Sequence, residues 1–198
     1  MRINPSRSFY ALLAAVIAAP PLAAETPSAN TFTFYSGRIS AEETWHDVLL
    51  KPHSSNYADS YLVSGAFSHA YGSKFGGRLR TEYEVNVTYN FGAQDHWELN
   101  VAPITLRWMQ FPWNERVRTT VAFGLGLSYA FDYPMVEYEL ENDTKQLLLF
   151  WQLELTAGPP EGNWSTVLRL HHRSPGWGAM GVADGGMNAP SLGFRYEF

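Results

Sequence analysis

The sequence of residues 79–91 is LRTEYEVNVTYNF, and two kinds of side chain alternate along it without interruption. One face carries mostly apolar and aromatic side chains, and the other carries arginine, glutamate, threonine and asparagine. Such a period of two is typical of a β-strand with two different surroundings. The run is 13 residues long, whereas strands in soluble proteins usually have about 5–6 residues. A strand of this length suits a lipid bilayer, which a tilted strand crosses in about 9–11 residues.

The same alternation recurs along the chain. Residues 119–131 place large apolar side chains on one face and small residues on the other, which suits the interior of a narrow barrel. Near Pro103 the alternation slips, which predicts a bulge. Eight strands are predicted in total, near 31–40, 58–71, 78–91, 96–108, 117–131, 145–157, 164–174 and 190–198.

The connections between these strands differ in length. Gly72–Gly77, Met109–Arg116 and Gly158–Asn163 are short, whereas 41–57, 132–144 and 175–189 are longer; the short Gly92–Asp95 breaks this rule. Short periplasmic turns and long external loops characterise outer-membrane barrels. We therefore predict an all-β fold, an eight-stranded antiparallel up-and-down transmembrane β-barrel with both ends of the chain on the periplasmic side.

The first two dozen residues are set apart from this pattern. Arg2 and Arg7 precede an apolar run that ends before a small-residue cleavage pattern at Ala23-Ala24. We predict that residues 1–24 are a signal peptide and that residues 25–198 form the barrel, exported through the periplasm to the cell outer membrane. The apolar run is shorter than the roughly 20 residues of a membrane-spanning helix.

The composition excludes a disulfide-stabilised fold and argues against some kinds of partner. Cysteine is absent, so no disulfide framework stabilises the chain, and the net charge of −5 argues against a nucleic-acid partner. Nothing in the sequence indicates a cofactor. The last residues, 192–198, alternate and end in Phe198; an aromatic last residue on such a strand resembles the signal that the barrel-insertion machinery of the outer membrane recognises.

Many charged residues lie on the side of the predicted strands that faces the interior of the barrel. They are Arg80, Glu82, Glu84, Glu98, Glu154, Arg169, Arg195 and Glu197. Eight strands enclose an interior that side chains fill, so these charges are expected to pair with one another or with trapped water. The alternative is a soluble periplasmic barrel of lipocalin type, in which the apolar faces point inward and the charged faces are wet.

One pair of residues could perform chemistry. His172 and Ser174 are two apart on the strand 164–174 and therefore share a face, with Cα atoms roughly 6.6 Å apart. A histidine can accept the proton of a serine hydroxyl and make it a nucleophile. Parity places both residues on the lipid-facing side, near the external end of the strand, where polar side chains are costly without a function. An ester-bearing outer-leaflet lipid could meet them there.

The span from about Asn163 to Phe198 resembles the lipid A 3-O-deacylase family, PagL-like acyloxyacyl hydrolases of the outer membrane. The resemblance rests on His172, Ser174, the glycine-rich segment that follows and the last strand, 192–198. It implies an eight-stranded barrel and a serine esterase that hydrolyses an acyl ester of lipid A (lipopolysaccharide), with Ser174 as nucleophile and His172 as base.

Two positions depart from the family pattern. The family has a glutamate that orients the histidine, and here Asn188 occupies that place, with Asp184 as the alternative orienter. An asparagine can accept a hydrogen bond from the histidine but does not stabilise its cation by charge. Pro175, which has no N–H, follows Ser174 where the family commonly has asparagine. Losing one oxyanion donor costs about 10²–10³ in rate, so the resemblance implies a slow or inactive relative.

A non-catalytic barrel is the competing prediction. Such a protein would have a structural role or bind a ligand through its external loops, of which 41–57 carries Trp45, His46 and His53. Two scattered histidines do not make a metal site. The two predictions differ in geometry: hydrolysis requires His172 and Ser174 to be lipid-facing, hydrogen-bonded and near an orienting residue.

Overall fold

The computed structural model describes residues 30–41, 44–51, 53–182 and 184–198. The predicted signal peptide, residues 1–24, lies outside these residues. Within them, none of the helices has the length and apolar character needed to span a membrane.

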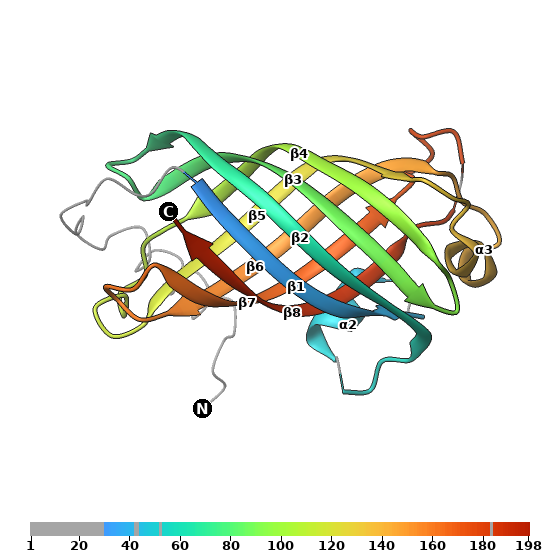
Figure 1. Ribbon diagram of the computed structural model, residues 1–198, viewed down its shortest axis with the longest axis horizontal. Helices are drawn as coiled ribbons and strands as arrows, with labels where there is room; N and C mark the ends of the chain where they lie inside the picture. The colour runs from blue at the N-terminus through green and yellow to red at the C-terminus, as the bar shows by residue number, and fades with distance from the viewer. Residues whose placement is uncertain (1–29, 42–43, 52, 183) are drawn as a thin grey trace, which may run out of the picture.

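Eight antiparallel strands form a closed barrel in sequence order, each paired with its neighbours in the chain and the last paired with the first (Figure 1). The strands are β1 (Asn30–Ser40), β2 (Tyr57–Lys74), β3 (Leu79–Gly92), β4 (His96–Trp108), β5 (Arg118–Ala130), β6 (Leu147–Gly158), β7 (Trp164–Ser174) and β8 (Met187–Glu197). All eight predicted strands and the all-β up-and-down barrel are confirmed. The turn predicted at Gly72–Gly77 is wrong for its first residues, because β2 continues to Lys74 beyond a register shift at Ala70–Gly72.

The bulge expected near Pro103 is also present. Between β4 and β5 the register moves from Val101↔Leu127 to Ile104↔Leu125, so β4 holds one extra residue there. Gly126 lies opposite the bulge, and a Cβ on it would come within 1.8 Å of the Val101 carbonyl oxygen. Only glycine fits at this close approach.

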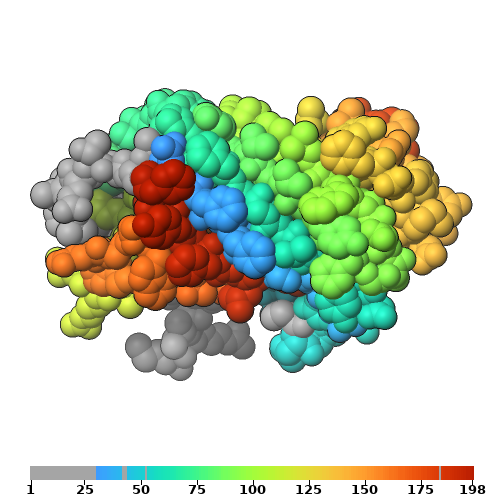
Figure 2. All heavy atoms as spheres, viewed as in Figure 1, coloured from blue at the N-terminus to red at the C-terminus, as the bar shows by residue number. Residues whose placement is uncertain are grey.

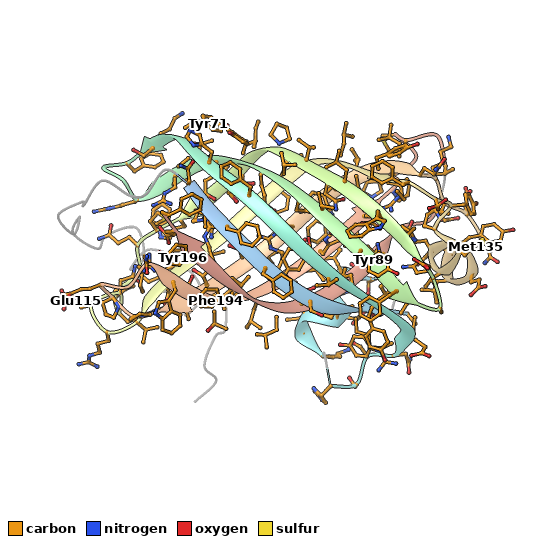
Figure 3. The ribbon with its side chains drawn as sticks, viewed as in Figure 1. Tyr71, Tyr89, Glu115, Met135, Phe194 and Tyr196 are labelled. Carbon is orange, nitrogen blue, oxygen red and sulfur yellow. The ribbon has the colours of Figure 1, made fainter. Side chains whose placement is uncertain are left out.

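The barrel has an apolar outside. Large side chains of the predicted lipid-facing parity are exposed on every strand, among them Phe34, Leu125 and Phe194. In Figure 2 the side chains of β8 and β1 lie side by side on this surface. Aromatic groups gather towards both ends of the barrel, as Tyr196 and Tyr89 illustrate in Figure 3. An apolar band with aromatic flanks is typical of membrane barrels, and it contradicts the lipocalin-type alternative.

The interior contains the charged residues that parity placed there, and they pair. Arg169 Nη1 lies 2.7 Å from Glu84 Oε1, and Arg107 Nη1 lies 2.8 Å from Glu154 Oε1. Arg169 also pairs with Glu154, and both Arg107 and Arg195 pair with Glu82. Two further pairs are Arg173–Glu98 and Arg118–Glu197. These ion pairs lie along the interior of the barrel. An apolar cluster that includes Tyr35, Ile39, Leu62 and Met187 meets them where the Arg169 guanidinium carbon lies 4.6 Å from the centroid of the Tyr35 ring.

The two ends of the barrel differ. At the near end, where Asn30 and Phe198 are joined by a backbone hydrogen bond of 3.0 Å, short turns connect the strands. At the opposite, far end the longer connections contain two short helices, α2 (Trp45–Leu50) and α3 (Met135–Glu141). Figure 1 shows α3 at the far end and α2 beside the barrel wall near that end. Both segments are expected from the sequence to be loops without helix, which is wrong for these residues.

Candidate active site on the outer face

The candidate site lies on the outer face of three neighbouring strands at the far end. His172 on β7 is opposite Trp151 on β6 and Asn188 on β8, and Ser174 is opposite Leu149. His172 and Ser174 share the outward face and are partly buried. The predicted placement of the pair on the outward face, near the end of its strand, is therefore confirmed.

His172 is hydrogen-bonded to a side chain of the neighbouring strand β8. Its Nδ1 lies 2.8 Å from Asn188 Oδ1. An amide oxygen can only accept, so Nδ1 carries the hydrogen and donates it. The neutral imidazole then has its lone pair on Nε2, the tautomer that a general base requires. Asn188 is 4% exposed, so the hydrogen bond is shielded from competing water.

Ser174 is held by its own chain. Its Oγ accepts a hydrogen bond of 3.0 Å from the Gly176 N–H. Between the described His172 and Ser174 side chains there is no hydrogen bond, so this part of the expected geometry is wrong. The Ser174 hydroxyl instead points to the Gly176 amide, from which it accepts its hydrogen bond. In free enzymes such bonds are often long and tighten when substrate binds.

The residue between the pair fixes the backbone from inside. Arg173 points into the barrel, where Nη1 lies 3.0 Å from Glu98 Oε1 and Nη2 donates to the Lys145 and Gln146 carbonyls at 3.0 and 3.1 Å. Its Nε lies 3.3 Å from Glu137 Oε1 on α3. Burial raises the pKa of the Glu137 carboxyl. An interior anchor thus holds the strand segment that presents His172 and Ser174 outward.

After Ser174 the chain forms a tight turn. Gly176, Trp177 and Gly178 all have positive φ values, 61°, 55° and 86°. Trp177 is not a glycine, so this conformation is strained. Its side chain is fully exposed.

Aromatic rings cover the histidine from one side. The Trp151 ring centroid lies 4.2 Å from that of His172, and Trp45 on α2 meets Trp151 edge-on at 5.8 Å. The helix α2 contacts β8, and Leu170, although outward by parity, is only 1% exposed there. Neither Trp151 nor α2 is among the parts of the site predicted from the sequence.

A local signal for α2 is present in the sequence. Trp45, Val48 and Leu49 have the spacing of one helix face. The hydroxyl of Thr44, just before the helix, donates a hydrogen bond to the Asp47 carboxylate. This hydrogen bond lowers the pKa of the Asp47 carboxyl. The position of Trp151 beside His172 could not be read in the same way, because it depends on strand register.

The other predicted residues lie apart from His172. Asp184 is exposed in the connection before β8 and has no hydrogen bond or ion pair with a described residue. Of the two candidate orienters, Asn188 is therefore the one that is hydrogen-bonded to His172. His46 lies on α2 against the Trp45 ring, and His53 lies in the turn after it. Across the described ranges, no group of three His, Asp or Glu side chains has the arrangement of a metal site.

A second histidine–asparagine pair exists on the outer face. His69 Nδ1 lies 2.8 Å from Asn30 Oδ1, and the Tyr83 ring lies 5.4 Å from the imidazole. This pair is at the near end, and the residue two positions further along β2 is Tyr71. A histidine–asparagine hydrogen bond on this surface is therefore not evidence of catalysis by itself. The serine at the next outward position distinguishes the His172 pair.

Comparison with solved structures supports the fold. The barrel is similar to the outer membrane enzyme PagL, with a TM-score of 0.59 and 13% identity over 85% of this chain and 99% of that chain. It is also similar to Neisserial surface protein A (NspA), with a TM-score of 0.52 and 13% identity over 88% and 100%. No family model matches the sequence, and no curated protein matches it. At these identities the likeness establishes the barrel fold alone.

Proposed function

We propose that this protein is an outer-membrane esterase that removes an acyl chain from lipid A at the cell surface. The observation that carries the proposal is an outward-facing Ser174 two residues from a histidine whose tautomer is fixed by Asn188. Likeness to PagL, an outer membrane enzyme, is consistent with it. The far end would face the cell exterior, so that the pair meets the outer leaflet.

The reaction follows from these groups. Ser174 Oγ attacks the ester carbonyl carbon while its proton moves to His172 Nε2, and the carbonyl electrons move to the oxygen. Collapse of the tetrahedral intermediate breaks the bond to the sugar oxygen, which takes the proton from His172. Water then attacks the acyl-serine with the same histidine as base. The fatty acid leaves, and Ser174 is restored.

The oxyanion requires donors that the proline cannot supply. Pro175 has no N–H, but the Gly176 N–H already lies 3.0 Å from Ser174 Oγ. We propose that this amide turns to the developing oxyanion when Oγ moves to substrate. The Trp177 N–H, next in the same strained turn, is the second donor.

Expression in a Gram-negative host tests the activity. Lipid A from cells that express the wild type is expected to lose one acyl chain by mass spectrometry, and cells that express Ser174→Ala are expected to keep it. Both proteins should show the heat-modifiable gel mobility of a folded barrel. Identical acylation with both folded proteins would refute hydrolysis of that lipid and favour a non-catalytic barrel.

Asn188 gives a graded test of the orienting role. Asn188→Leu keeps the size of the side chain but removes the acceptor, and we expect kcat to fall by about 10-fold or more because the histidine loses its tautomer and aim. Asn188→Asp adds a charge that stabilises the imidazolium, and we expect kcat to rise. A comparison of kcat and KM for the purified variants would check both. Equal kcat values for the three proteins would exclude an orienting role.

A further inference from the structure

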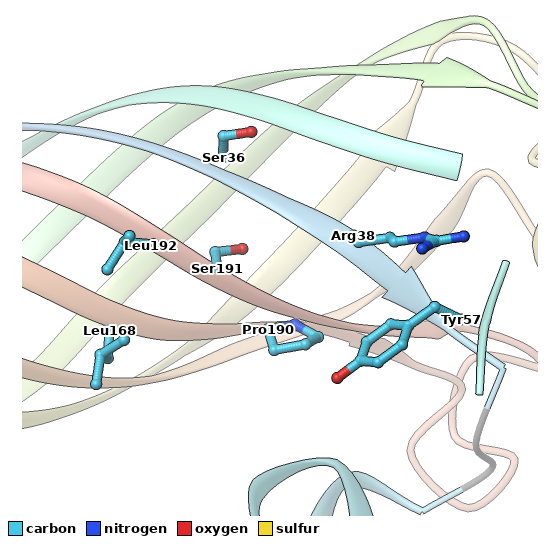
Figure 4. A pocket seen from close by; sticks show the side chains of 7 residues that line it. All are labelled: Ser36, Arg38, Tyr57, Leu168, Pro190, Ser191 and Leu192. Carbon is cyan, nitrogen blue, oxygen red and sulfur yellow. The ribbon is translucent and has the colours of Figure 1, made fainter. Parts of the chain in front are cut away.

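A second feature of the outer face is a groove beside the candidate site. It has a volume of about 510 Å³ and is lined by Ser36, Arg38, Tyr57, Leu168, Pro190, Ser191 and Leu192, from β1, β2, β7 and β8 (Figure 4). Volumes of this order are typical of small-molecule sites. The groove lies on the surface that faces lipid in a membrane barrel.

The lining is polar at one end and apolar at the other. Figure 4 shows Arg38 and Tyr57 together at one end, with Leu168 and Leu192 at the opposite end. Along β1, Arg38 is near the far end of the barrel, whereas Leu192 is opposite Ser36, closer to the middle. The polar end therefore lies at the level of lipid headgroups and the apolar end at the level of acyl chains, as one lipid molecule requires.

Arg38 is prepared to bind an anion. Its Nε donates to the Ala58 carbonyl at 2.9 Å, and its guanidinium carbon lies 5.8 and 5.3 Å from the ring centroids of Tyr57 and Tyr61. Among the residues that the structure describes, no carboxylate forms an ion pair with it. Because Nε makes the backbone hydrogen bond, the Nη groups are available to a ligand. A guanidinium binds phosphate through two parallel hydrogen bonds.

The groove is close to the candidate site but separate from it. Pro190 is two residues from Asn188 on β8, and Arg38 is two residues from Ser40, the β1 partner of Asn188. Arg38 and Ser174 are two strands and about four residues apart, which corresponds to roughly 16 Å at ordinary sheet spacings. A single phosphate-ester linkage does not span that distance. A lipid with several acyl chains on a phosphorylated saccharide does.

We propose that the groove binds an uncleaved acyl chain of the substrate lipid, with a phosphate of its saccharide headgroup on Arg38. This inference rests on the proposed function, because it takes the occupant to be the molecule hydrolysed at Ser174. It makes Arg38 a specificity-determining residue for phosphorylated lipid.

Lipid binding, rather than turnover, tests the inference. The probes are bisphosphorylated and chemically dephosphorylated lipid A, bound to the full-length mature protein in detergent and measured by native mass spectrometry. All proteins carry Ser174→Ala so that the lipid is not consumed. Arg38→Gln is expected to weaken binding of the phosphorylated lipid about 10-fold and to leave the dephosphorylated lipid unchanged. The matched control is Arg116→Gln, an exposed arginine at the near end, which should bind both lipids as the parent does.

A second variant tests whether the groove binds an acyl chain. Ser36→Trp fills the groove and is expected to weaken binding of both lipids, whereas Ala157→Trp, on the outer face of β6 near the other end, is not. Unchanged binding in folded Arg38→Gln and Ser36→Trp proteins would overturn the inference, even if the enzyme deacylates lipid A. Arg38-dependent binding without any deacylation by the wild type would instead retain the groove as a lipid site and refute the esterase.

Discussion

His172→Gln is expected to lower kcat for lipid A deacylation by about 10²–10⁴-fold, the usual contribution of a general base. Glutamine has nearly the same reach and can still donate to Asn188 Oδ1, which now accepts from the imidazole at 2.8 Å. It has no lone pair basic enough to accept the serine proton. The measurement is the initial rate of fatty acid release by purified protein, with kcat and KM determined separately.

The outer face provides a matched control for this variant. His69 also donates to an asparagine oxygen at 2.8 Å and also lies against an aromatic ring, but at the near end of the barrel. His69→Gln removes the same side chain from an equivalent environment, so any general effect on folding or insertion should be shared. We expect its kcat to remain that of the wild type. Equal losses in the two variants would contradict a base at His172.

Much of the fold could be predicted because strand parity is a local property. The alternation in residues 79–91 assigns each side chain to a face without reference to any other strand. The same alternation along residues 164–174 assigns Arg169 to the interior, where it pairs with Glu84 of the first run. The slip at Pro103 marked the bulge in the same way, because an extra residue changes the parity of everything that follows.

The site could be predicted only in part, since its parts come together through strand register. His172 and Ser174 are neighbours on one strand, so their common face follows from the sequence. Trp151 reaches His172 only because β6 and β7 pair as they do, and register depends on turn lengths and bulges. The bond from the Gly176 amide to Ser174 depends on a turn with positive φ values at Gly176 and Trp177. Alternation contains no information about such a turn.

The short helices show a second limit of the parity argument. Residues 45–50 form α2 against β8, and the last residues of that segment are exposed. A six-residue helix is not stable alone, so it forms because the barrel wall buries Val48 and the Trp45 ring meets Trp151. The competing prediction treats this segment as an external loop without secondary structure. The structure places it on the wall instead, beside His172.

Arg169→Met is expected to destabilise the barrel by about 3–5 kcal/mol, the usual effect of removing one partner from a buried ion pair. Arg169 is completely buried and is the one cation paired with Glu84 among the described residues, whereas Glu154 also has Arg107 at 2.8 Å. The variant thus leaves Glu84 charged and unpaired in the interior. Urea unfolding in detergent or lipid vesicles, followed by tryptophan fluorescence and by heat-modifiable mobility, measures the change, and the exposed Arg116→Met controls for loss of an arginine. Adding Glu84→Gln should restore part of the stability, because it removes the stranded charge. A loss below about 1 kcal/mol, or no recovery in the double variant, would show that the interior ion pairs do not hold the barrel together.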